Sequence, residues 1–249
     1  MSYEGKVVIV TGAASGIGKA TAEWMAREGA SLILGDLNEA GLKAVAAGLQ
    51  AKIAPVVLAY DQGDPKSCAD FMAKAVAAHG RLDMLCNIAG MMEWSPVGEY
   101  SAERFDRIVR VNLAGVFNLS HAAARHLIET KGNIVNVASS AGLVGIAYAS
   151  AYSATKHGVV GLTRSMAVEL AHQGVRVNAI CPTGVNTPMI QQAVFPEGAD
   201  VNLIMRSASK LGGVVEPEEI AAAIGYLGSE MARQISGVSL PIDGAQTIG

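Results

Sequence analysis

The sequence predicts an α/β fold with one doubly wound parallel sheet and helices on both of its faces. Short apolar runs alternate with longer helical stretches that end in glycine, which is the chain order of right-handed β-α-β crossovers. A glycine-rich turn follows the first apolar run and opens the first helix. No linker, low-complexity tract or change in composition divides the 249 residues, so we expect residues 1–249 to form a single domain.

The expected strands are short and almost wholly apolar, as is typical of strands buried on both faces of a parallel sheet. They lie at residues 6–11, 30–35, 81–86 and 133–138. Between them, helices are expected to end at Gly29, Gly80, Gly132 and Gly174, and the two longest cover about 101–130 and 151–173. The pairs Asp64-Pro65 and Glu216-Pro217 each place an acidic residue and a proline at a helix start, which favours initiation there.

Residues 187–213 form the one irregular stretch. They are rich in apolar side chains but lack a clear period, and they contain Pro188, Pro196 and the pair Gly212-Gly213. A long insertion near the carboxyl end of a strand is typical of a lid. We therefore expect residues 187–213 to cover a substrate site, and we call them the lid segment.

Composition excludes several classes of protein. The net charge of −3 is not that of a nucleic-acid-binding domain, and no apolar run approaches the ~20 residues of a membrane span. The run at residues 7–10 is too short for the apolar part of a signal peptide. The three cysteines are odd in number and far apart, which indicates small buried side chains in a reducing, cytoplasmic setting. No His or Cys cluster has metal-ligand spacing, so no metal site is expected.

Three glycines mark a cofactor site. Gly12, Gly16 and Gly18 follow a strand and open a helix, where glycine lets the backbone turn tightly and approach a pyrophosphate at the helix N-terminus. Asp36 closes the second strand, and its carboxylate can accept hydrogen bonds from an adenosine ribose. A 2′-phosphate would meet a like charge there, and no basic neighbour compensates. The sequence therefore predicts a Rossmann-type fold with NAD as its cofactor.

A second motif indicates acid–base chemistry. Tyr152 and Lys156 are four residues apart, so they share one face of an expected helix. An adjacent ammonium favours the phenolate, and we expect it to bring the tyrosine pKa below its ordinary ~10. Ser139 ends an apolar strand, where its hydroxyl can hold a substrate oxygen while the tyrosine exchanges a proton.

These motifs together resemble the short-chain dehydrogenase/reductase family, and the resemblance covers nearly the whole chain. Several independent motifs carry it in the family's order: residues 11–18, Asp61, residues 87–90, Asn112, Ser139, Tyr152, Lys156 and residues 181–188.

The resemblance implies a catalytic role for four residues. Tyr152 is expected to be the general acid/base, and Lys156 to lower its pKa and hold the nicotinamide ribose. Ser139 is expected to position the substrate oxygen. Asn112, inside a helix, is expected to help anchor a proton-relay water through its backbone.

The resemblance also implies which residues surround the ligands. Cofactor contacts are expected from Gly12, Ser15, Gly16, Ile17, Gly18, Asp36, Leu37, Asp61, Gln62, Asn87, Ala89, Gly90, Tyr152, Lys156, Pro182, Val185 and Thr187. The substrate pocket is expected to include Met91, Ser140, Leu143, Met189 and Phe195.

Two positions depart from the family pattern. Ile88 stands where the family often has a second asparagine, and we expect it to cost a structural hydrogen bond between strands. Thr183 stands where glycine is common; it either stiffens the turn under the nicotinamide or shifts the glycine's role to Gly184. The family also implies a homotetramer, with helices that start near Ser101 and Ala151 buried on two-fold axes.

The expected function is hydride transfer between NAD(H) and a secondary alcohol or ketone. The apolar lid segment favours an apolar cyclic or aryl substrate, such as a hydroxysteroid-like alcohol. Two alternatives stay open. An NADPH-linked 3-ketoacyl-type ketoreductase is opposed by Asp36, and a non-catalytic dinucleotide-binding protein is opposed by the intact set of Ser139, Tyr152 and Lys156.

Overall fold

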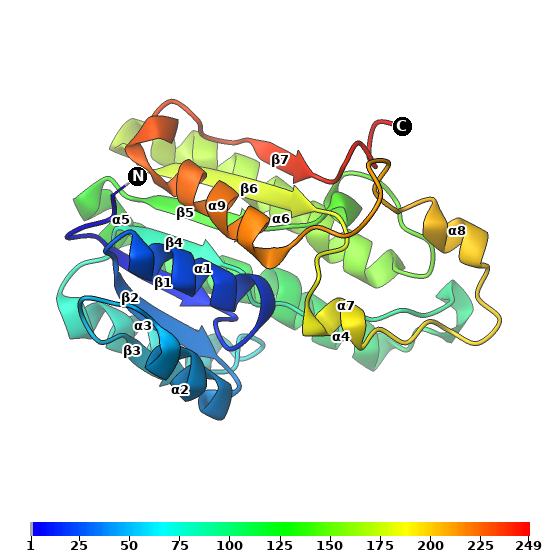
Figure 1. The fold of residues 1–249 in the computed structure, drawn as a ribbon, viewed down its shortest axis with the longest axis horizontal. Helices are drawn as coiled ribbons and strands as arrows, with labels where there is room; N and C mark the ends of the chain where they lie inside the picture. The colour runs from blue at the N-terminus through cyan, green and yellow to red at the C-terminus, as the bar shows by residue number, and fades with distance from the viewer. Residues whose placement is uncertain (1) are drawn as a thin grey trace.

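A computed structural model describes residues 2–249, so Met1 of the expected domain lies outside the described residues. It confirms the fold class: one parallel sheet of seven strands in the order β3-β2-β1-β4-β5-β6-β7, covered by helices on both faces (Figure 1). The strands are β1 (Val7–Thr11), β2 (Ser31–Asp36), β3 (Val56–Ala59), β4 (Met84–Asn87), β5 (Asn133–Val137), β6 (Arg176–Pro182) and β7 (Ser239–Ile242).

Helices connect consecutive strands, as the expected crossovers require. They are α1 (Gly16–Arg27), α2 (Glu39–Gly48), α3 (Pro65–His79), α4 (Ala102–Val109), α5 (Gly115–Thr130), α6 (Ser150–Leu170), α7 (Pro188–Gln191), α8 (Val201–Met205) and α9 (Pro217–Gly228). Short 3₁₀ turns lie at Val97–Glu99, Ser140–Gly142, Ala171–Gln173 and Glu230–Ala232, and a π turn, η2, at Arg110–Ala114.

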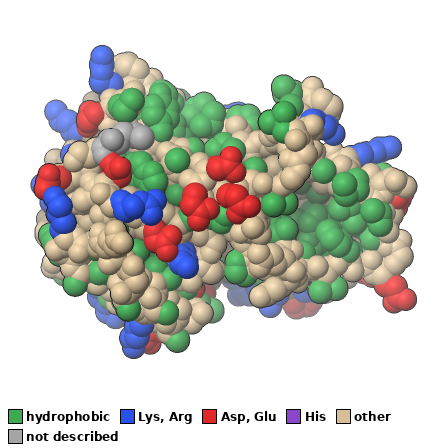
Figure 2. Space-filling model, in the orientation of Figure 1, with side chains coloured by type: hydrophobic (Ala, Val, Ile, Leu, Met, Phe, Trp, Pro, Cys, Tyr) green, Lys and Arg blue, Asp and Glu red, His purple; other side chains and the backbone are tan. Residues whose placement is uncertain are grey.

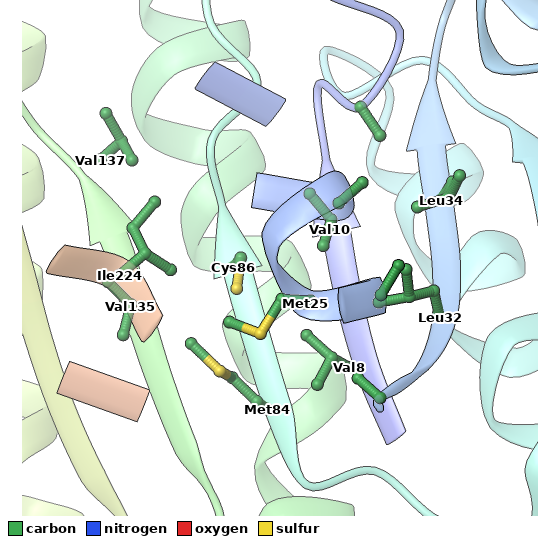
Figure 3. Close-up of a cluster of buried hydrophobic side chains, with 14 of the residues drawn as sticks. Val8, Val10, Met25, Leu32, Leu34, Met84, Cys86, Val135, Val137 and Ile224 are labelled. Carbon is green, nitrogen blue, oxygen red and sulfur yellow. The ribbon is translucent and has the colours of Figure 1, made fainter. Parts of the chain in front are cut away.

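The core consists of two apolar layers, one on each face of the sheet. On one face, α1, α2 and α9 cover alternate strand side chains, and Met25 and Ile224 pack onto Val8, Met84 and Val135 (Figure 3). On the other face, α3, α5 and α6 cover the strand side chains that point to that side of the sheet. Side chains alternate between faces along a strand, so both layers need apolar residues, and the strands become continuous apolar runs.

The expected helix starts are confirmed. The Asp64 side chain accepts a hydrogen bond from the Lys66 amide at 3.0 Å and caps α3, with Pro65 in the first turn. At α9, Glu216 and Glu219 form a reciprocal capping box. Each bond satisfies an amide that has no partner inside its helix.

The strand expected at residues 81–86 begins later, at Met84. The residue before it is the buried Asp83. Its carboxylate accepts hydrogen bonds from Arg81, from the Lys6 ammonium and from the Val7 amide, and these partners lower its pKa although burial opposes them. A charged side chain at this depth needs such partners. The Asp83 backbone still pairs with both neighbours, because its amide donates to the Val7 carbonyl and its carbonyl accepts the Asn133 amide, at 2.9 and 3.0 Å.

The helix expected over 101–130 is not continuous. The π turn η2 separates α4 from α5 and contains Asn112. A π turn widens the helix by one residue and is frequent at functional sites. Here it accompanies an inward-facing Asn112, whose side-chain contacts are described below.

The lid segment is largely aperiodic, as expected, but contains the short helices α7 and α8. No residue from Pro188 to Glu219 is buried. Figure 2 shows hydrophobic side chains gathered on the surface over this part of the molecule, where Val194, Val201 and Met205 are all more than half exposed. The segment therefore lies on the core without contributing to it.

Within residues 2–249 we find no helix with the length and apolar character needed to cross a bilayer.

Candidate active site

Two adjoining cavities open at the carboxyl ends of the strands. β1 and β4 are neighbours in the sheet although their connections run to opposite sides, so they form the switch point where doubly wound sheets bind ligands. The first cavity, of about 280 Å³, lies at the ends of β5 and β6 below the lid segment. The second, of about 400 Å³, lies over the glycine-rich turn. Both are lined by Ile17, Ile88, Gly90, Met91, Thr187 and Met189, so they form one elongated cleft.

The glycine-rich turn forms the floor of the second cavity. A Cβ at Gly18 would lie 2.0 Å from the Gly12 carbonyl oxygen, and a Cβ at Gly12 would lie 2.9 Å from Ala89. Gly12 and Gly16 also have positive φ, 66° and 50°, which glycine adopts without strain. The N-cap Ser15 makes no side-chain cap bond, so the first-turn amides of α1 remain available to an anion. The turn therefore fits a dinucleotide pyrophosphate.

Asp36 lies at the far end of this cavity. One of its carboxylate oxygens accepts the Ala14 amide at 3.1 Å, and the other accepts the Asn38 amide at 2.9 Å. These bonds fix the carboxylate beside the glycine-rich turn, next to Leu37 and Asp61. No Lys or Arg is among the described residues that line the second cavity, so its charged groups are carboxylates.

Gln62 and Asn87 were expected to contact the cofactor, but their side-chain amides donate hydrogen bonds to other parts of the protein. The Gln62 amide donates to the Ala89 and Val111 carbonyls at 3.0 and 2.9 Å, and its oxygen accepts the Tyr60 hydroxyl. Asn87 is buried, lines neither cavity, and donates to Asn136 on β5 and Ser120 on α5.

Ile88 was expected to cost a hydrogen bond between strands. Its neighbour Asn87 supplies a side-chain hydrogen bond between β4 and β5. Ile88 packs against the core and lines both cavities.

Sequence reasoning missed one structural residue of the site, Thr11. Its hydroxyl donates to the Cys86 carbonyl and accepts the Ile88 and Ala89 amides at 2.9 and 3.1 Å. It therefore fixes the loop after β4 against the end of β1. The available signal was a buried hydroxyl residue that ends an otherwise apolar strand.

Ser139, Tyr152 and Lys156 meet in the first cavity, and all three are buried. Ser139 follows β5, while Tyr152 and Lys156 lie one turn apart on α6. Gly142 allows the close approach, because a Cβ there would lie 2.7 Å from the Lys156 carbonyl oxygen. The Ser139 hydroxyl accepts the Ala141 amide at 3.1 Å and reaches the Pro182 carbonyl only at 3.5 Å, so its proton can turn to a substrate oxygen.

The pKa expectation for Tyr152 is wrong for the cofactor-free protein. Burial raises the pKa of Tyr152 to about 12, against a lowering effect of the Ser139 hydroxyl. Burial also lowers the pKa of Lys156 to about 8. The Lys156 ammonium lies 5.6 Å from the centre of the tyrosine ring and donates to the Val137 carbonyl at 2.8 Å. Desolvation of the buried phenolate therefore decides the direction of the Tyr152 shift.

Asn112 occupies the same corner of the cleft. Its side-chain oxygen accepts the Met91 amide at 2.8 Å, and its nitrogen donates to the Met91 carbonyl at 2.8 Å. A Cβ at Gly90 would lie 3.2 Å from the Asn112 oxygen and 3.7 Å from the Lys156 ammonium. Gly90 thus lets the loop after β4 pass between these two side chains.

Most of the expected pocket residues line the first cavity: Met91, Ser140, Met189 and Phe195. Leu143 does not. It packs instead against Val116, Val159 and other apolar residues behind the cavity. Trp94 also lines the cavity and was missed; its ring lies 4.9 Å from that of Phe195 at 59°. Its only signal was an aromatic residue just after the Met91-Met92 pair.

The end of β6 closes the cleft. Pro182 and Val185 line the first cavity, and Thr187 lines both. Thr183 donates through its amide to the Ile242 carbonyl and through its hydroxyl to the Ser207 carbonyl of the lid segment, at 3.2 and 3.3 Å. Thr183 therefore connects the turn after β6 to β7 through its amide and to the lid segment through its hydroxyl.

The fold and the cleft together define a nicotinamide-dinucleotide-dependent oxidoreductase with a Ser-Tyr-Lys group. A family model described as enoyl-(acyl carrier protein) reductase matches residues 12–247. The chain belongs to the short-chain dehydrogenase/reductase family.

Known relatives span its whole length. The chain is 38% identical over 252 residues to the 3-oxoacyl-[acyl-carrier-protein] reductase FabG of Thermotoga maritima, covering 100% of each chain. It is 39% identical over 248 residues to the cis-4-hydroxycyclohexanecarboxylate dehydrogenase of Sinomonas cyclohexanicum, covering 99% of this chain and 98% of the relative. A structure of 3-ketoacyl-(acyl-carrier-protein) reductase from Brucella melitensis complexed with NADH superposes with a TM-score of 0.90 at 31% identity, covering 99% and 100% of the two chains.

Proposed function

We propose that this protein is an NAD-dependent dehydrogenase that interconverts a cyclic, largely apolar secondary alcohol and its ketone. The observation that carries the proposal is the convergence of Ser139, Tyr152 and Lys156 in an apolar cavity that adjoins a cavity ending at Asp36. Proton-transfer groups and a ribose-binding carboxylate then lie at opposite ends of one cleft.

The chemistry follows from the position of each side chain. When bound, the nicotinamide ring exchanges a hydride with the carbinol carbon. Ser139 holds the substrate oxygen by a hydrogen bond, and the Tyr152 hydroxyl takes the proton from that oxygen in oxidation or returns it in reduction. Lys156 stabilises the phenolate electrostatically, and Asn112 shapes the corner beside it. Fixed placement of the reacting groups lowers the barrier by up to roughly 7–11 kcal/mol.

The preference for NAD over NADP rests on Asp36. Its carboxylate is anchored by two backbone amides and can accept hydrogen bonds from the ribose hydroxyls. A 2′-phosphate would face this charge without any Lys or Arg among the described residues of the cavity wall. The NADH in the Brucella melitensis relative is in line with this choice.

The substrate class rests on the first cavity. Most side chains of its wall are apolar, Met91, Trp94, Met189 and Phe195 among them, and Lys156 is the one cationic side chain among the described residues that line it. Such a wall suits a hydrocarbon ring better than a phosphorylated sugar. The relative from Sinomonas cyclohexanicum acts on a hydroxylated six-membered ring, which supports a cyclic alcohol.

A reductase of carrier-linked 3-oxoacyl substrates is the second candidate, because the Thermotoga maritima relative has that activity. The two candidates differ in cofactor and substrate. A panel of cyclic and aryl secondary alcohols with NAD, compared with a 3-oxoacyl thioester and NADPH, decides between them when followed at the absorbance of the reduced cofactor. Turnover of the thioester with NADPH and of no cyclic alcohol with NAD would overturn our proposal.

We also propose a cytoplasmic homotetramer. Phe105 on α4 and Phe117 on α5 are both nearly half exposed, and Val168 on α6 is 82% exposed, so these helices present apolar surface to a second copy. The three cysteines are free and buried, as in proteins of reducing compartments. Light scattering should give about four times the 25.6 kDa chain mass, and a monomer at micromolar concentration would contradict it.

A further inference from the structure

Tyr148 has a backbone conformation that bulky residues rarely adopt. Its φ is 59°, one of three positive values outside glycine among the described residues. It lies just before α6, in the loop that leads from Ser139 to Tyr152. Strain of this kind persists only where surrounding contacts hold it, and it concentrates at functional sites.

The backbone carbonyl and the side-chain hydroxyl of Tyr148 each accept a hydrogen bond from another segment. Its carbonyl accepts the Ser95 amide at 2.8 Å, which joins the loop after β5 to the loop after β4. Its hydroxyl accepts the Asp200 amide at 2.9 Å, across 52 residues of sequence. Asp200 is the N-cap of α8, and its side chain accepts the Asn202 amide at 2.8 Å. The tyrosine therefore binds the lid segment at the start of α8.

A second contact holds the lid segment close by. Trp94, next to Ser95, packs against Phe195, five residues before Asp200. Because the Ser95–Tyr148 bond joins the two anchoring loops, residues 195–200 are held at both ends by one unit. Beyond Asp200, Ile204 and Met205 of α8 line the first cavity together with Tyr152, so the position of α8 sets part of the cavity wall.

Beyond α8, the lid segment is also held where the Ser207 carbonyl accepts the Thr183 hydroxyl at 3.3 Å and where the Lys210 amide donates to the Gly244 carbonyl at 2.8 Å. No residue from Pro188 to Glu219 is buried, so the core does not hold it. Segments with few buried apolar contacts open at low free energy, and single hydrogen bonds then decide how much of the time they stay closed.

We propose that Tyr148 is a positioning residue whose hydroxyl tethers α8 in the closed position and so completes the substrate pocket beside Tyr152. The inference rests on the proposed function for its effect on substrate, but the tether itself is a property of the cofactor-free protein. From this backbone conformation the side chain reaches the lid segment at Asp200.

Tyr148→Phe tests the tether, because it removes only the hydroxyl and keeps the ring and the backbone strain. Limited trypsin digestion of the cofactor-free protein should cut after Arg206 and Lys210, both exposed, about fivefold faster in the variant, as loss of one hydrogen bond predicts. Tyr226→Phe is the matched control: Tyr226 is partly exposed on α9, and its hydroxyl makes no hydrogen bond to a described residue. It should digest like wild type.

Tyr148→Gly separates the tether from the strain. It removes the hydroxyl and the ring and also relieves the positive φ, so the lid segment should be cut at least as fast as in Tyr148→Phe. Wild-type cleavage rates at Arg206 and Lys210 in both variants would overturn the proposal.

Kinetics supplies a readout that general destabilisation would not give. In Tyr148→Phe, KM for the best alcohol of the panel should rise about fivefold while kcat and the dissociation constant of NAD stay near wild type. An unchanged KM together with wild-type cleavage rejects the tether. If no alcohol turns over, the proposed function fails, and the digestion experiment still decides the role of Tyr148.

Discussion

Asn112 holds the backbone of Met91 from both sides, with one 2.8 Å hydrogen bond to its carbonyl and one from its amide. Met91 lines both cavities of the cleft. The fully buried Asn112 lies in the π turn between α4 and α5, where its neighbour Leu113 packs against the apolar cluster of Val116 and Val159. The turn therefore fixes the wall between the cofactor end and the substrate end of the cleft.

Asn112→Ala should leave the Met91 amide and carbonyl without partners. An unsatisfied buried group costs about 1–3 kcal/mol, so the free energy of unfolding in urea should fall by at least that amount. NAD affinity should fall as well, because the wall loosens. Asn112→Asp is the control: it keeps the acceptor for the Met91 amide and loses the donor. A wild-type unfolding curve for Asn112→Ala would show that these two hydrogen bonds carry no net stability.

Asp36 should make NAD bind at least about tenfold more tightly than NADP, a difference of about 1.4 kcal/mol. Asp36→Asn keeps an oxygen for the Ala14 or Asn38 amide and removes the charge, so it should narrow this gap with little loss of stability. Asp36→Ala should narrow the gap and also weaken NAD. The measurement is the dissociation constant of both cofactors for each variant. Equal constants in the wild type would mean that Asp36 does not face the ribose.

Tyr152→Phe should abolish proton transfer and leave the cofactor end intact. General acid/base groups contribute roughly 10²–10⁴ in rate, and we expect a loss in the upper part of that range because the same hydroxyl also orients the substrate oxygen. NAD affinity should change by less than a few-fold. Lys156→Met differs, since turnover and NAD affinity should fall together. More than a tenth of wild-type turnover in Tyr152→Phe would reopen the non-catalytic alternative.

The buried Lys156 should make stability depend on pH. Its pKa falls from 10.5 to about 8 on burial, so between these values the unfolded chain binds more protons than the folded one. The free energy of unfolding of the cofactor-free protein therefore gains a contribution that rises with pH above about 8, by at most about 1.4 kcal/mol per pH unit.

Urea unfolding at a series of pH values from 7.5 to 9.5 measures this slope. Lys156→Met has no group to titrate, so its curve should lack that rise, and the difference between the two proteins isolates the lysine. Parallel pH dependence in wild type and Lys156→Met would contradict a depressed pKa. The window stops below the range in which Tyr152, whose pKa is raised to about 12, would add the opposite slope.

The strands and the site motifs could be predicted because each depends on local pattern. Strands buried on both faces must be apolar throughout, as β1 and β5 are, and such runs are visible in the sequence. The glycines of the turn are required by close backbone contacts that any side chain would block. β3, β6 and β7 were not predicted. β3 and β7 lie at the sheet edges and are only partly buried, so their apolar patterns are weaker. β6 is buried, but Arg176 and Asn178 interrupt its apolar run.

Other features depended on partners far away in the sequence. The buried Asp83 carboxylate binds the Lys6 ammonium and the Val7 amide, and Leu143 packs behind the cavity against side chains of α5 and α6. The pKa of Tyr152 is raised where the sequence predicted a lowering, because the spacing of two residues gives no information on how deeply both are buried.

The sequence by itself determined the doubly wound sheet, the glycine-rich turn, the carboxylate at the end of β2 and the Ser-Tyr-Lys group. Each follows from the residue types that a short stretch of backbone requires. Only the tertiary structure decided the raised pKa of Tyr152, the two hydrogen bonds between Asn112 and Met91, and the hydrogen bond between the Tyr148 hydroxyl and the lid segment. Those features arise from burial and from hydrogen bonds between distant segments, which depend on the packing of the whole chain.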